Sequence, residues 1–120
     1  MYEVFLSSAV KRDFRRIGHA AARDVLRQIN KKLTTDPEGY GERLHDALKG
    51  YHKLSVGDCR VVYKIIEDRV WVLVLAVGKR AEGDFENIYS WLTKERATKR
   101  LEEIWGDVPG QGDVCDGEEA

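Results

Sequence analysis

Four cationic side chains stand where they could act together on one ligand. Arg60 lies within an apolar stretch, and Lys53 lies in the apolar stretch before it. Lys79 and Arg80 directly follow a third apolar stretch. If these stretches are neighbouring strands of one antiparallel sheet, the four side chains could converge on a single concavity. Because a cationic cluster repels itself unless an anion fills it, and guanidinium groups bind phosphate well, the pattern predicts a phosphate-binding site.

A purely structural explanation of the two arginines is also open. Arg60 and Arg80 could form ion pairs with carboxylates instead of binding a ligand. The candidate partners are Asp58, Glu67, Asp84 and the acidic C-terminal residues. The distances between the charged atoms decide between the two interpretations.

Hydrophobic periodicity divides the chain into four strands and three helices. Apolar positions three and four residues apart indicate helices, whereas short alternating or continuous apolar runs indicate strands. The expected strands are residues 2–6, 51–56, 59–66 and 70–77, and the expected helices are residues 8–17, 19–33 and 81–105. Residues 34–41, which contain Pro and Gly, are expected to form a loop, and residues 44–50 a loose connecting segment.

The order of these elements, β-α-α-β-β-β-α, predicts an α+β fold. A helical hairpin and a C-terminal helix should pack on a small, mostly antiparallel sheet of about four strands. Residues 70–77 are apolar on both faces and are expected to be the central strand. A single domain is expected over residues 1–105, whereas Pro, Gly and acidic residues predict an acidic, disordered tail over residues 106–120.

Charge is unevenly distributed along the 120 residues. Residues 1–100 hold all 20 Lys and Arg against 14 of the 21 Asp and Glu, which gives this part a net charge of +6. One face of the second expected helix is strongly basic, with Arg23, Arg27, Lys31 and Lys32. A basic body suggests a polyanionic partner, although a solvated helix face would have the same composition.

The sequence indicates no membrane-spanning segment, no signal peptide and no metal site. The longest apolar run, residues 70–77, is far shorter than the roughly 20 residues that cross a bilayer. The N-terminus lacks the regions of a signal peptide, so a cytoplasmic location is expected. Cys59 and Cys115 have no second Cys or His at metal-ligand spacing, and no metal or other cofactor is expected.

Three motifs together resemble the RelE/ParE superfamily of toxins from toxin–antitoxin modules. They are LKG at residues 48–50, VGDCRVVY at residues 56–63 and VGKR at residues 77–80. Each fragment is weak alone, but their order and spacing match the family over residues 2–92. The resemblance implies a RelE-like fold, an antitoxin partner that blocks the basic site, and no cofactor.

The RelE-like branch implies a metal-independent endoribonuclease that cleaves mRNA, on the ribosome in several relatives. The 2′-OH of the RNA attacks the adjacent phosphorus, and cations stabilise the charge that develops there. By the resemblance, Arg60 and Arg80 bind the phosphate, and Arg80 also assists the leaving group. Lys53 is the candidate for activating the 2′-OH, and Lys79 is a substrate-binding candidate.

The sequence departs from the RelE pattern at two positions. Ser55 stands where RelE has a second lysine, and Phe85 stands where it has a base-stacking tyrosine. Phe85 can still stack, and Tyr89, one helical turn on, could replace the tyrosine. His52 is a further substrate-binding candidate, but adjacent strand residues face opposite sides, so His52 and Lys53 cannot both point into the site.

Two alternatives to a ribonuclease remain at this point. A ParE-like toxin would poison gyrase as a binding protein and cleave no RNA. A catalytically decayed toxin would survive as a binding or regulatory protein. The set of Lys53, Arg60 and Arg80 favours the ribonuclease, whereas the missing lysine and tyrosine favour the alternatives.

Overall fold

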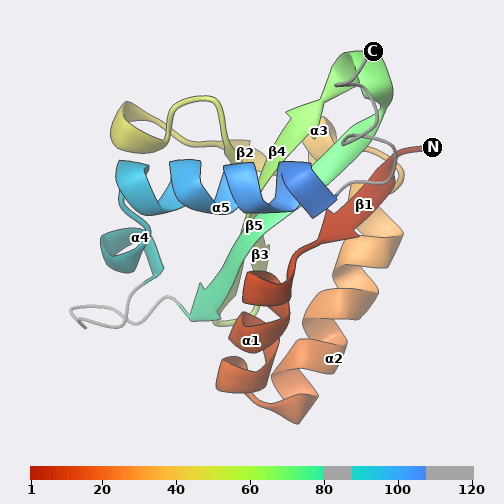
Figure 1. Ribbon diagram of the computed structural model, residues 1–120. Helices are drawn as coiled ribbons and strands as arrows, with labels where there is room; N and C mark the ends of the chain where they lie inside the picture. Colours follow the sequence, from red (N-terminus) through yellow and green to blue (C-terminus); the bar gives the residue numbers. More distant parts are fainter. Residues whose placement is uncertain (80–87, 108–120) are drawn as a thin grey trace.

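Five strands form one mixed sheet at the centre of the fold. The computed structural model describes residues 1–79 and 88–107 (Figure 1). The strands lie in the order β1-β5-β4-β3-β2, with β1 parallel to β5 and every other neighbouring pair antiparallel. Their bounds are β1 (Glu3–Leu6), β2 (Glu42–Arg43), β3 (His52–Val56), β4 (Cys59–Ile66) and β5 (Trp71–Lys79).

Helices cover both faces of this sheet. The hairpin of α1 and α2 packs on one face, whereas α4 and α5 pack on the other, and α5 crosses the strands in Figure 1. The α-helices are α1 (Ser8–Ile17), α2 (His19–Gln28), α3 (Pro37–Tyr40), α4 (Ile88–Trp91) and α5 (Lys94–Asp107). A π-helical turn, η1 (Ile29–Leu33), extends α2, and the 3-10 turns are η2 (Asp46–Leu48) and η3 (Glu67–Arg69).

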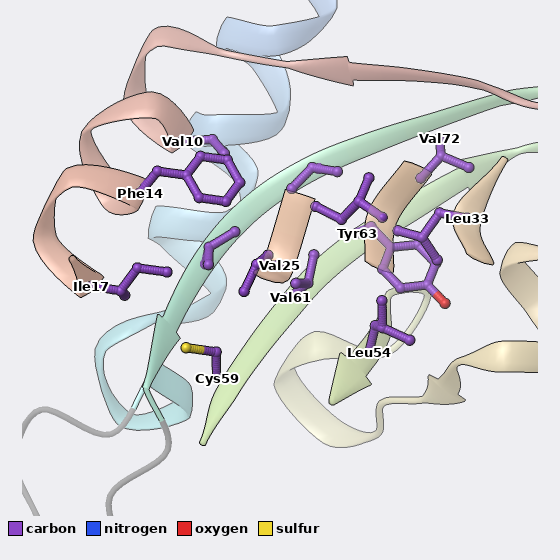
Figure 2. Packing of buried hydrophobic residues seen from close by; sticks show 13 residues of the cluster. Val10, Phe14, Ile17, Val25, Leu33, Leu54, Cys59, Val61, Tyr63 and Val72 are labelled. Carbon is purple, nitrogen blue, oxygen red and sulfur yellow. The ribbon is translucent and has the colours of Figure 1, made fainter. Parts of the chain in front are cut away.

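The core on the side of the helical hairpin is continuous. Figure 2 shows Val10, Phe14 and Ile17 of α1 in one buried cluster with Val61 and Tyr63 of β4. The helical spacing of the three α1 residues directs them to this face, and the Ser7 side chain caps the helix by accepting a hydrogen bond from the Val10 N–H.

The core on the other side is built from the opposite faces of the same strands. Leu73 and Leu75 of β5 are fully buried there against Leu92, Ala97 and Ile104. Because β5 is buried on both faces, its sequence is almost continuously apolar.

One buried ion pair joins the two layers at the edge of β5. Strand β1 pairs with β5 only as far as Val74, so the next backbone groups of β5 need other partners. The Asp13 carboxylate accepts a hydrogen bond from the Val77 N–H at 3.0 Å, and the Arg100 guanidinium donates to the Leu75 carbonyl at 3.0 Å. Arg100 also donates to Asp13 at 2.5 and 3.2 Å, which fastens α5 to α1 and β5.

The predicted α+β fold, helical hairpin and mostly antiparallel sheet are confirmed, and three details differ. The segment of residues 34–41 contains α3, whose start is capped by Asp36, and is followed by the two-residue strand β2. The position at the middle of the sheet belongs to β4, with β5 next to it. Instead of one helix within residues 81–105, α4 and α5 are separate, because Thr93 caps a new start by accepting from the Arg96 N–H.

The expected C-terminal tail lies almost entirely outside the described residues, which end inside it at residue 107, where α5 also ends. Within residues 1–79 and 88–107, no helix has the length and apolar character needed to cross a membrane.

Candidate functional site

Lys53 and Arg60 share the face of the sheet on which α4 and α5 pack. In the register of β3 and β4, Lys53 lies opposite Val62 and Arg60 lies opposite Ser55. Directly opposed residues point to the same face, so the two cations are diagonal neighbours, roughly 7–8 Å apart at the backbone. The structure therefore brings together two of the three predicted catalytic cations.

The turn between β3 and β4 holds Arg60. Its Nη1 donates to the carbonyl oxygens of Gly57 and Cys59, both at 2.9 Å. Within the described part of the chain no carboxylate forms an ion pair with Arg60, so pairing with Asp58 or Glu67 is not observed. The turn thus fixes one end of the guanidinium group and leaves a cationic surface toward solvent.

Lys53 has one acidic and one aromatic neighbour. Its Nζ lies 3.4 Å from Oε1 of Glu42, the residue opposite it on β2, and 5.6 Å from the centre of the Tyr89 ring. The Lys53 side chain is 27% exposed, and that of Glu42 is 75% exposed. A cation beside the face of an aromatic ring is attracted to it, so Tyr89 and Glu42 together hold the ammonium group at the rim of the sheet.

Gly78 brings α4 close enough for this contact. Gly78 lies opposite Arg60 on β5, and a Cβ built there would be 3.1 Å from the Ile88 side chain. Because a glycine leaves this space open, Ile88 packs directly on the strand. Its neighbour Tyr89 then lies over Lys53, so Gly78 of the VGKR motif positions a site residue.

The other predicted site residues lie on the opposite face of the sheet or outside the described residues. Lys79 lies opposite Cys59, which puts it on the α1 side of the sheet, where it lines a pocket with Arg16. Arg80 and Phe85 lie outside the described residues. Their expected roles therefore remain predictions.

His52 faces away from Lys53. Its ring stacks on Tyr63, with ring centres 5.6 Å apart and an angle of 22° between the planes. Both ring nitrogens are buried, with no hydrogen-bond partner among the described residues. Burial lowers the pKa of His52 below its ordinary value, an effect that the nearby Glu38 carboxylate opposes. Of the two adjacent candidates, Lys53 is the one that shares a face with Arg60.

Residues 4–83 match the sequence model of a family described as "ParE toxin of type II toxin-antitoxin system, parDE". The chain belongs to this toxin family. It is also similar to Toxin RelE of Mycobacterium tuberculosis, with 28% identity over 80 residues that cover 67% of this chain and 82% of the relative.

Solved structures of RelE toxins share the toxin's fold. The RelBE2 toxin–antitoxin complex of M. tuberculosis aligns with a TM-score of 0.63 and 25% identity, covering 68% of this chain and 93% of that one. The isolated E. coli RelE toxin aligns with a TM-score of 0.57 and 21% identity, covering 84% of this chain and 99% of that one. The toxin therefore has a RelE-like fold, as its motifs predicted.

The contacts of Glu42 and of Trp91 at the site were not predicted from the toxin's sequence. Glu42 lies in a strand of two residues, too short for alternation to reveal, and meets Lys53 across the sheet. Trp91 of α4 contacts Arg96 and Arg100 of α5, whose guanidinium groups are 5.2 and 4.6 Å from its ring centre. These contacts hold α4, and with it Tyr89, against α5. Within the described residues, no group of three His, Cys, Asp or Glu could hold a metal ion.

Proposed function

We propose that the toxin is an endoribonuclease that cleaves mRNA without a metal ion and so inhibits translation. The observation that carries this proposal is the pair of Lys53 and Arg60 on one face of the sheet, with Tyr89 beside Lys53. A phosphate between two cations and a base against a tyrosine ring are the contacts that a single RNA strand needs.

The proposed reaction is an internal transesterification of the RNA. The 2′-oxygen forms a bond to the adjacent phosphorus, and the bond from phosphorus to the 5′-oxygen breaks. The products are a 2′,3′-cyclic phosphate and a 5′-OH, which takes up the proton that balances the one lost from the 2′-OH. Arg60 stabilises the negative charge that develops on the phosphate oxygens, and Arg80 is proposed to share this role and to assist the leaving oxygen.

Lys53 is proposed to act on the attacking 2′-OH. A lysine can accept a proton only when its amine is neutral, and otherwise contributes through its charge. Glu42 and Tyr89 orient the charged ammonium group. Lys79, Phe85 and His52 are proposed as weaker substrate contacts, and for His52 the stacking on Tyr63 favours a structural role.

The helical hairpin supports action on a large RNA such as the ribosome. Residues 8–33 expose many cations and only one acid, Asp24, which pairs with Arg27 at 3.3 Å. The exposed cations are Lys11, Arg12, Arg15, Arg16, Arg23, Arg27 and Lys31. A face of this kind attracts polyphosphate over long distances and without sequence preference. Translated mRNA also implies the cytoplasm as the place of action.

A cognate antitoxin is the proposed protein partner. The similar M. tuberculosis chain belongs to a toxin–antitoxin complex, and the matching family is defined by such systems. A partner that covers Lys53 and Arg60 would block the RNA site. The proposed antitoxin therefore inhibits by occupying the cationic rim.

A ParE-like toxin that poisons gyrase is the second candidate, because the matching family description names ParE. Ser55, in place of a second lysine, also fits a toxin without cleavage, including a decayed one that only binds.

Primer extension on a reporter mRNA in a coupled translation reaction separates the candidates. We expect discrete new 5′ ends in the presence of the toxin, and these should persist on purified RNA in EDTA if ribosomes are dispensable. Arg60→Ala should reduce cleavage by about 10²–10³-fold, the usual cost of one donor to a transition-state oxyanion. Arg69→Ala, in η3 beyond the far end of β4, is the matched control. Intact mRNA with continued translation would overturn the proposal and favour the gyrase or decayed-toxin alternatives.

A further inference from the structure

A groove opens beside the candidate site, between η2 and the junction of α4 and α5. Its volume is about 510 Å³, within the ~300–1,000 Å³ typical of small-ligand sites. Leu48 and Leu92, both buried, form its apolar floor, and Tyr89 is one of its walls. The groove is therefore continuous with the site, because the same Tyr89 ring lies 5.6 Å from Lys53 Nζ.

The rim of the groove carries hydrogen-bonding groups of both kinds. Asp46 and Glu95 present carboxylates, and His45 and Lys94 present nitrogen groups, all on exposed residues. An open groove with an apolar floor, an aromatic wall and a polar rim suits a nucleobase, which is apolar on its faces and polar at its edge.

The backbone on one side of the groove has a left-handed conformation at Asp46. Asp46 has a φ of +57°, in the left-handed region that, apart from glycine, mainly Asp and Asn adopt. The buried Leu48 and the hydrogen bond from the Lys49 N–H to the Asp46 carbonyl at 3.1 Å keep it there. These two contacts therefore hold Asp46 in one conformation at the rim of the groove.

We propose that this groove binds a nucleobase of the RNA next to the scissile phosphate and so determines which sequences the toxin cuts. The inference rests on the proposed ribonuclease function and adds a specificity site to it. The base stacks on Tyr89 while its phosphate lies toward Lys53. The carboxylates of Asp46 and Glu95 accept hydrogen bonds from the base edge, so bases that present N–H donors there are preferred.

Two substitutions test the groove in different ways. Ala47→Trp places a large side chain on an exposed position of the groove wall and should fill it. Asp46→Asn exchanges an oxygen acceptor for an amide that also donates, and Asn tolerates the left-handed backbone. Ala20→Trp, exposed on α2 away from the groove, is the matched control for the added aromatic group.

The measurement is a map of cleavage sites on an RNA pool of random sequence, with ribosomes present if cleavage requires them. The wild type should prefer certain bases at one position flanking the cut by about tenfold, the size of one base contact. Ala47→Trp should abolish that preference, and Asp46→Asn should shift it toward bases that present acceptors. Ala20→Trp should leave the preference unchanged, and thermal unfolding should verify that all three variants are folded.

The outcomes separate this inference from the proposed function. If the wild type cuts no RNA, both fall. If the wild type cuts but its flanking-base preference survives in both groove variants, only the groove assignment is overturned. Loss of antitoxin binding in Ala47→Trp with an unchanged cleavage map would also overturn it, because the groove would then be a protein-binding surface.

Discussion

The two faces of the sheet differ in how their helices are held. On one face, α1, α2 and η1 follow each other directly in the chain and bury a continuous apolar stripe. On the other, α4 has four residues, and α5 depends on Arg100 reaching a carboxylate 87 residues away. The candidate RNA site and the groove both lie at the rim of this second face. The first face is thus held by a continuous apolar core. On the second face, a few specific contacts of α4 and α5 determine the geometry of the site.

The largest effect on stability should come from the ion pair that joins the faces. Asp13→Ala leaves Arg100 without its partner and the Val77 N–H without its acceptor in a site where Asp13 is 2% exposed. Removing one member of a buried pair costs about 3–5 kcal/mol, and urea unfolding measures the loss. Asp24→Ala, which removes a carboxylate from an exposed pair on α2, should cost less than about 1 kcal/mol. Equal losses in the two variants would contradict the special role of Asp13.

Gly41→Ala tests the packing of the first face and should have the next largest effect. A Cβ at Gly41 would overlap the Tyr63 hydroxyl and lie 2.9 Å from the Lys53 carbonyl oxygen. The Tyr63 hydroxyl is fixed because it donates a hydrogen bond to the Pro37 carbonyl at 2.5 Å. We expect a loss of about 1–3 kcal/mol in the free energy of unfolding, as for other overpacked sites. Gly106→Ala in α5, where a Cβ meets nothing within 4 Å, should instead stabilise slightly.

Local sequence patterns predicted the first face better than the second. The spacing of Val10, Phe14 and Ile17 and the cap at Ser7 are local signals, and they placed α1 correctly. The break at Thr93 was missed, because apolar residues continue at helical spacing on both sides of it. Nothing near Asp13 indicates that it is buried, since its partner Arg100 is distant in sequence.

The candidate site also combines residues that the sequence pointed to with contacts that it did not reveal. Lys53 and Arg60 were expected to converge if their strands were antiparallel neighbours, and the register of β3 and β4 puts both on one face. The contact of Lys53 with Glu42 depends on the short strand β2, which no periodicity reveals. Lys79 was expected to join Lys53 and Arg60 but lies on the α1 side of the sheet, opposite Cys59. The sequence therefore identified the strands that carry the cations, and the register of the folded sheet decided which cations share a face.

Gly78→Ala should separate activity from stability on the second face. The added Cβ would be 3.1–3.2 Å from Ile88, so α4 must shift by a few tenths of an ångström, at a cost of about 1 kcal/mol or less. The shift moves Tyr89 relative to Lys53, and misplacement of this kind lowers the proposed cleavage rate by about tenfold. Ile88→Val, which removes the nearest Ile88 atom, should restore part of the rate when combined with Gly78→Ala. A rate unchanged by Gly78→Ala would show that α4 does not set the geometry of the site.

The smallest expected effect is a pH dependence of the free energy of unfolding that comes from His52 on the first face. Because burial lowers the pKa of His52, the unfolded chain takes up a proton near pH 6.5 while the folded chain remains neutral there. Proton uptake by the unfolded state favours unfolding, so the free energy of unfolding should decrease as the pH falls below about 6.5 and level off once the folded-state pKa has been passed.

His52→Phe keeps a ring against Tyr63 but cannot titrate. It should reduce the slope of the free energy of unfolding against pH between pH 6.5 and pH 5, a range above most carboxyl pKa values. His45→Gln, at the exposed residue before η2, is the control for removing a histidine. A slope that persists in His52→Phe would mean that another group is responsible, and that the first face tolerates a charged ring at this position.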